Sequence, residues 1–137
     1  MVVIGFNFTE IHAERKGSPQ GKIGITNNIT LQEVKKVDLP LGSNKQDGIV
    51  INFIFNADYT PNIGKIELKG EIVILEDKKT VADVLDEWKK SKKLSEKLVD
   101  PVFNNILNRA TIEGLIISRD IGLPPLLRIP KIGPKKK

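Results

Sequence analysis

The stretch NNILNRATIEGLIISRDIGLPPLLRIPKI, residues 104–132, is the most informative part of this chain. It joins an amphipathic helical pattern to a Ser-Arg pair at 118–119, a Gly-Leu-Pro-Pro turn at 122–125 and an apolar strip at 123–132. The strip has too many prolines to pair as a central strand and too many apolar residues for an ordinary solvated tail. We therefore expect it to pack along a surface, either the chain's own sheet or another chain.

Two helices are predicted upstream of the strip. The first begins near Thr80, which with Asp83 approximates a capping box, and it continues through an apolar face into a lysine-rich last turn. The second begins at Asp100-Pro101, where an N-cap acid precedes proline at the first helical position. Its apolar stripe is expected to end near Arg119, ahead of the glycine and proline of the turn.

The first half of the chain alternates apolar and polar residues with the period of two that is typical of half-buried strands. Four strands are predicted, at residues 2–13, 23–37, 49–59 and 66–74. The first changes phase between Phe8 and Ile11, as a bulge produces, and residues 38–48 are interpreted as a loop. The short connection Tyr59–Asn62 makes the last two strands an antiparallel hairpin.

The order of four strands followed by two helices predicts an α+β fold, an antiparallel four-stranded sheet with both helices packed on one face. None of the connections between the strands has a helical pattern, which argues against a βαβ arrangement. With 137 residues the chain is long enough for one domain with a real core. We expect that domain to span residues 1–132, and residues 133–137 to form a disordered basic tail.

Composition excludes several classes of function. There is no cysteine, so no disulfide framework or thiolate metal site can form, and His12 is the single histidine, which excludes a multi-histidine site. No apolar run approaches the length of a membrane helix, and the N-terminus lacks the pattern of a signal peptide, so we expect a cytoplasmic protein. The abundance of lysine and isoleucine is typical of proteins from thermophiles.

The sequence contains no recognisable catalytic constellation. No phosphate-binding glycine loop and no nucleophile elbow occurs. His12 is expected to lie on the surface of the first strand without the positioned partner that a general base needs. Glu67 and Glu71 share one face of a strand at about 13 Å, too far apart for a retaining carboxylate pair. We therefore predict that the protein is not an enzyme and uses no cofactor.

The net charge of +5 is unevenly distributed. Lys135, Lys136 and Lys137 contribute +3, which leaves +2 for residues 1–134. A second group, at the end of the first predicted helix, comprises Lys89, Lys90, Lys92 and Lys93. Both groups are candidates for phosphate contacts, so a small basic protein that binds RNA or single-stranded DNA is one alternative function. The few aromatic residues lie mainly at core-facing positions, which favours the interpretation of these lysines as a solvated surface.

The segment from Ile106 to Ile132 resembles the C-terminal part of the SecB family of export chaperones. That family has a helix with an Ala-Arg pair, a hydrophobic stretch that ends in Ser-Arg, a Phe-Pro turn, and a leucine-containing strip with a further proline. Residues 50–74 are also similar to the central pair of strands of the family. The residues that carry the C-terminal likeness are Arg109-Ala110 in reversed order, Ile112, Ile116, Ser118-Arg119, Leu123-Pro124-Pro125, Leu127 and Pro130.

The resemblance implies an ATP-independent holdase, a homotetramer built as a dimer of dimers that holds unfolded polypeptides in long apolar grooves. Such a protein needs contiguous apolar surface that tolerates many client sequences. The alternative for each candidate groove residue is burial in its own core or in a subunit interface. The candidates are Leu123, Leu126, Leu127 and Ile129 of the strip, together with Tyr59 and Trp88.

Three features of the chain depart from the family pattern, one of which is that the loop between the second and third strands has no matching signature. Members that serve export are strongly acidic, whereas this chain is basic, and a basic surface changes which clients bind. We expect no counterpart of the C-terminal helix and tail that engage the motor ATPase SecA, so export through that motor is not implied. An adaptor for one specific partner is therefore a third possibility beside the chaperone and the nucleic-acid-binding protein.

Overall fold

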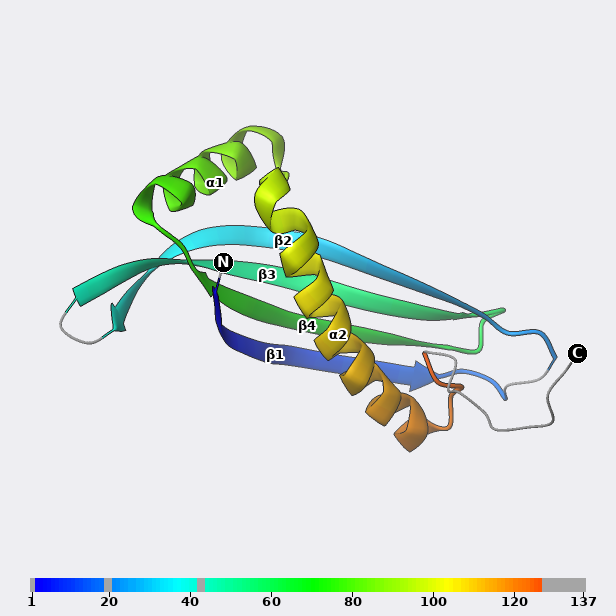
Figure 1. Ribbon diagram of the computed structural model, residues 1–137. Helices are drawn as coiled ribbons and strands as arrows, with labels where there is room; N and C mark the ends of the chain where they lie inside the picture. Colours follow the sequence, from blue (N-terminus) through cyan, green and yellow to red (C-terminus); the bar gives the residue numbers. More distant parts are fainter. Residues whose placement is uncertain (1, 19–20, 42–43, 127–137) are drawn as a thin grey trace, which may run out of the picture.

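The computed structural model describes residues 2–18, 21–41 and 44–126. The strands form one antiparallel sheet in the order β1-β4-β3-β2 (Figure 1). The α+β class and the predicted order of the elements are confirmed. The elements are β1 (Val2–Arg15), β2 (Gly24–Leu41), β3 (Asn44–Thr60), β4 (Gly64–Leu75), α1 (Lys78–Ser91) and α2 (Glu96–Ile121).

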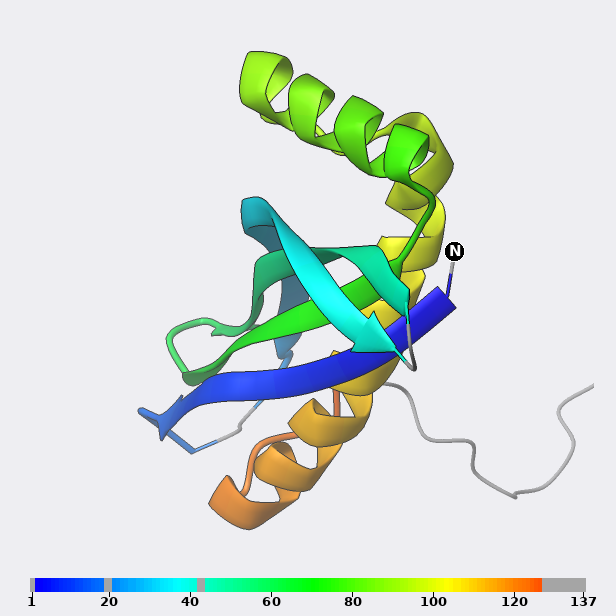
Figure 2. The same ribbon diagram turned by 90° about the vertical axis from the view of Figure 1, so that its left-hand side faces the viewer.

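Both helices cover the same face of the sheet, as the strand patterns predict. The longer helix α2 crosses the strands diagonally, and α1 stands at the β2 side of the layer (Figures 1 and 2). Alternate residues from Ile49 to Tyr59 in β3 and from Ile66 to Ile74 in β4 are buried beneath them. The opposite face carries charged side chains such as Lys65 of β4 and is left without a helix among the described residues.

Bulges in the outer strands restore the apolar alternation wherever it changes phase. The register of β1 against β4 shifts between Phe8 and Glu10, which confirms the predicted bulge, and again near the start of the strand. The shift brings Ile11 opposite Leu68, a residue of the helix-covered face. The extra residue thus places Ile11 on the helix-covered side together with Phe6 and Phe8, whereas Val2, opposite Leu75, lies on the other side.

The prediction of a loop at residues 38–48 is wrong. β2 and β3 pair through nearly all of it, with Val37 opposite Gly48 and Pro40 opposite Lys45. The pairing of β3 with β4 ends at Gly48, so beyond this residue the ribbon has only two strands. Apolar and polar residues still alternate from Val37 to Pro40, where Val37 and Leu39 are half-buried. The proline and glycines within residues 38–48 are nevertheless typical of a loop, which explains the wrong prediction. Proline is tolerated there because β2 is an edge strand.

Both helices begin earlier than their sequence signals predicted. The N-cap of α1 is Asp77, whose carboxylate accepts a 2.7 Å hydrogen bond from the backbone N–H of Thr80, so Thr80 lies inside the helix. The same hydrogen bond lowers the pKa of Asp77. In α2 the first residue is Glu96, and Pro101 lies inside the helix. The end of α2 is as predicted, because Gly122 adopts the left-handed conformation (φ 73°) that favours glycine.

The core beneath the helices divides into two clusters along the sheet. The first, here the corner cluster, lies where α1 meets α2 and comprises Val34, Ile49, Ile51, Phe53, Ile72, Ile74, Val81, Val84, Trp88, Leu94, Leu98, Val102 and Ile106. The second, here the strip cluster, lies beneath the C-terminal half of α2 and comprises Phe55, Ala57, Tyr59, Ile63, Ile66, Leu68, Ala110, Ile117, Leu123 and Leu126.

Candidate polypeptide-binding site

The first part of the apolar strip packs on the chain's own sheet. Leu123 and Leu126 are only 6% and 8% exposed and belong to the strip cluster. Gly114 of α2 makes room for Leu126, because a Cβ built on this glycine would lie 2.1 Å from Leu126 Cδ1. Leu123 reaches Gly64 at the start of β4 in the same way, with a methyl 3.1 Å from the position of a Cβ. The two leucines therefore fill the space between α2 and the sheet.

A tyrosine at the end of β3 holds this packing in place. The hydroxyl of Tyr59 donates a hydrogen bond to the backbone carbonyl of Pro124, and the side chain is 1% exposed. Burial raises the pKa of Tyr59 to about 12, which outweighs the opposite effect of a hydrogen bond with Ser118. Tyr59 is thus a core residue of the single chain, and its role in a groove stays a prediction. Leu127 and Ile129 lie outside the described residues.

Two adjoining hollows meet at Trp88, between β2 and the corner of the helices. Their volumes are about 430 and 440 Å³, and both are lined by Trp88 and Lys92. Together they follow β2 from Ile29 to Val34, a length of roughly 20 Å for an extended chain. We call this pair of hollows the Trp88 groove. It lies beside an edge strand, since β3 is the one strand that pairs with β2 among the described residues.

The Trp88 groove has an apolar lining. Leu94 is buried, and the side chains of Leu31, Val99 and Phe103 are half-buried, so part of each is open to solvent. Trp88 itself is 8% exposed and belongs to the corner cluster. Side chains left half-open in this way still have apolar surface to lose to a ligand. Of the predicted groove residues that the structure describes, Trp88 lines this groove, and Tyr59 lines a separate hollow of about 420 Å³ near the end of β3.

Lysines surround the groove. Lys89, Lys92 and Lys93 line it, are exposed, and make no ion pair within the described part of the chain. The ammonium of Lys92 lies 5.8 Å from the centre of the Trp88 ring, within the range of a cation–π contact. Lys90 differs, because its ammonium pairs with Asp86 at 3.0 Å. The structure thus brings together residues that the sequence assigned to two different functions, and Lys135–Lys137 lie outside the described residues.

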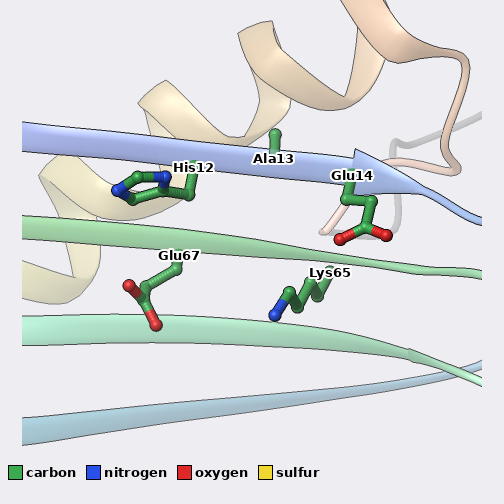
Figure 3. Close-up of a pocket in the computed structure, with 5 residues that line it drawn as sticks. All are labelled: His12, Ala13, Glu14, Lys65 and Glu67. Atoms are coloured by element: carbon green, nitrogen blue, oxygen red, sulfur yellow. The ribbon is translucent and has the colours of Figure 1, made fainter.

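A further hollow, of about 390 Å³, lies on the uncovered face of the sheet (Figure 3). His12 and Glu14 of β1 and Lys65 and Glu67 of β4 line it. His12 is exposed, as expected, and its Nε2 lies 3.3 Å from Glu10 Oε1. Exposed pairs of this kind contribute little to stability or binding. Within residues 2–18, 21–41 and 44–126 no group of three or more metal-binding side chains gathers, and neither helix is long and apolar enough to cross a membrane.

Comparison with known proteins defines the class of fold. No protein-family model and no curated protein matches the chain. Among solved structures the chain is similar to the SecB-like chaperone Rv1957 of Mycobacterium tuberculosis, in complex with a ChAD peptide from the Rv1956 HigA1 antitoxin. The similarity covers 97% of this chain and 91% of that chain, with a TM-score of 0.54 and 11% identity. At this identity the likeness shows the fold, which is SecB-like.

Proposed function

We propose that this protein is an ATP-independent holdase that binds unfolded polypeptides in the Trp88 groove. The observation that carries the proposal is an apolar, partly open groove beside an edge strand in a SecB-like fold. The similar SecB-like chaperone was solved with a peptide from another protein, which supports a polypeptide as the ligand here. The proposal involves no chemical step and no cofactor, and it places the protein in the cytoplasm.

The chemistry of the groove suits an extended chain. Half-buried apolar side chains lose their remaining solvent contact when a client residue covers them, without a demand for one client sequence. The free edge of β2 offers backbone groups to which an extended segment can add hydrogen bonds. By binding the unfolded client, the protein shifts the equilibrium of that client away from its folded and aggregated states.

Aggregation of a heated client protein tests the proposal. We expect suppression at stoichiometric amounts and without nucleotide. Val99→Lys places a charge in the lining of the groove and should abolish most of the suppression. Val50→Lys is the matched control, because Val50 is also half-buried but pairs with Val73 on the uncovered face. No protection by the parent chain, or equal protection by both variants, would contradict the proposal.

We further propose that the chain forms a homotetramer, as a dimer of dimers. Mass measurement under native conditions tests this assembly, and a monomer at micromolar concentration would refute it. Large apolar side chains on the surface of the single chain support association. These exposed residues are Val2, Ile4 and Ile11 of β1 and Leu107, Ile112 and Ile116 of α2.

The unpaired lysines favour nucleic-acid binding as the second candidate function. RNA or single-stranded DNA would contact Lys89, Lys92 and Lys93, and its affinity would fall steeply as salt rises. An adaptor of one specific partner is the third. It would retain one partner of fixed stoichiometry and show no general affinity for unfolded chains. Binding of an unfolded model client and of oligothymidine, each at low and high salt, separates the three.

A further inference from the structure

The charges around the Trp88 groove are mainly positive. From Lys89 to Lys97 the chain carries five lysines and one acid, Glu96. On the opposite wall Glu33 is already satisfied, since its carboxylate lies 3.2 Å from the ammonium of Lys35 and 3.5 Å from the side-chain amide of Asn52. An occupant therefore meets an apolar lining with a rim of uncompensated positive charge.

From this arrangement we propose that the groove selects extended polypeptide segments in which apolar residues are flanked by Asp or Glu. The proposal rests on the proposed function and adds to it the class of client. Apolar client residues cover Leu31, Val99 and Phe103, while flanking carboxylates lie near Lys92 and Lys93. Complementary charge of this kind selects among clients and speeds their encounter more than it adds affinity.

Two other occupants fit these observations less well. The chain's own end, residues 127–137, carries five cations and no acid, so it offers no complementary charge. A single-stranded nucleic acid has the charge but needs open aromatic faces on which bases stack. Trp88 is 8% exposed, and the rest of the lining is mainly aliphatic. An acidic, apolar peptide satisfies both the lining and the rim.

The chain contains its own reporter of occupancy, because Trp88 is its single tryptophan. We would titrate the full-length protein with three tryptophan-free peptides that share one Leu-Phe-Val-Leu core and carry flanking runs of Glu, Ser or Lys. The fluorescence of Trp88 should report binding of the Glu-flanked peptide about tenfold tighter than the Lys-flanked peptide at low salt. The difference should shrink as salt shortens the range of the charges.

A charge reversal tests whether the lysines at the rim of the groove cause the preference for acidic flanks. The double variant Lys92→Glu/Lys93→Glu should prefer the Lys-flanked peptide. Lys22→Glu/Lys79→Glu is the control, because it changes the net charge equally at two exposed lysines that line none of the hollows described and should keep the original preference. Circular dichroism checks that both variants fold. The salt titration of the parent chain tests the same point without any substitution.

The possible outcomes separate the two proposals. Binding of no peptide contradicts the proposed function, and the client preference falls with it. Equal binding of all three peptides, or preference for Lys flanks, overturns the inference and leaves the holdase proposal standing. An unchanged preference in Lys92→Glu/Lys93→Glu overturns the assignment to this rim. Oligothymidine that binds more tightly than every peptide and displaces them would assign the groove to nucleic acid instead.

Discussion

The space between the helices and the sheet is filled at one end of the covered face and left partly open at the other. At the strip cluster, the chain closes the space between α2 and the sheet with Leu123 and Leu126, and the hydroxyl of Tyr59 holds the Pro124 carbonyl. At the corner cluster, the corresponding space beside Trp88 stays partly open. A helix laid across a sheet thus leaves a trough on each side, and a ligand can enter where the chain does not fill the trough itself.

The path of α2 explains which end is filled. Because the helix crosses the strands diagonally (Figure 1), its buried side changes along its length. Ala110, Gly114 and Ser118 are small residues buried in its C-terminal half, and Gly114 leaves room for Leu126. The N-terminal half buries Leu98, Val102 and Ile106, which reach the sheet without an additional layer. Side-chain size along one helix therefore decides where the layer is closed.

The largest effect is expected from opening the closed end. Leu123→Ala removes a side chain that is 6% exposed, and it should lower the free energy of unfolding by about 2–5 kcal/mol, as buried leucine truncations do. Asn108→Ala, at an exposed position of α2, is the control and should cost under about 1 kcal/mol. Urea denaturation measures both. Equal losses would show that the strip is not part of the core.

Enlarging a side chain at each end should sharpen the contrast. Ala110→Leu overpacks the closed end, where Ala110 is fully buried, and should cost about 1–3 kcal/mol. Val99→Leu adds one carbon at the open end and should change the free energy of unfolding by under about 1 kcal/mol, because the hollow has room for it. Thermal unfolding of the two variants measures the difference. A larger cost for Val99→Leu would mean that the open end is as tightly packed as the closed one.

A smaller effect is expected from removing the hydrogen bond at the closed end. Tyr59→Phe leaves the Pro124 carbonyl without its donor and should cost about 1 kcal/mol at pH 7. Ser91→Ala is the control, because its hydroxyl donates to the Glu87 carbonyl from an exposed position. Denaturant titration compares them, and a Tyr59→Phe variant as stable as the parent would contradict the role given to this hydrogen bond.

Tyr59 should also make the free energy of unfolding depend on pH in the alkaline range. A tyrosine in an unfolded chain ionises near pH 10, whereas the pKa of Tyr59 in the fold is about 12. Between these values the unfolded state loses its proton first, so this contribution is complete below pH 10 and is lost as pH rises through 12. Tyr59→Phe should remove that part of the slope. Absorbance at alkaline pH reports the ionisation directly, because Tyr59 is the single tyrosine.

Much of the fold could be predicted from local patterns. The alternation in β3 and β4 and the glycine after α2 correctly placed the hairpin, the covered face and the end of the helix. The prediction failed at residues 38–48, where a proline and two glycines are typical of a loop although β2 pairs with β3 as far as Leu41 and Asn44. It also placed the start of α2 at Asp100-Pro101, although the helix already begins at Glu96. The first turn of α2, which the Asp100-Pro101 signal does not predict, contains the buried residue Leu98.

The candidate site was less accessible to sequence reasoning. Trp88 and its neighbouring lysines were recognised, but as members of two competing functions. Trp88 and the lysines line one groove only because Leu31 of β2 and Phe103 of α2, which are distant along the chain, form its other walls. The bulge that separates Leu31 from Glu33 in the pairing register shapes the same wall. No local pattern marks such a meeting of elements.

The amino-acid sequence by itself determined the strand and helix periods, the apolar face of each element and the sign of the charge beside Trp88, because these depend on neighbours within a few residues. Only the tertiary structure decided that Leu123 and Leu126 close one trough while the other stays open. The strip is equally apolar wherever it lies. The burial of Leu123 and Leu126 depends on the diagonal path of α2 and on Gly114 facing Leu126, which are relations between distant parts of the chain.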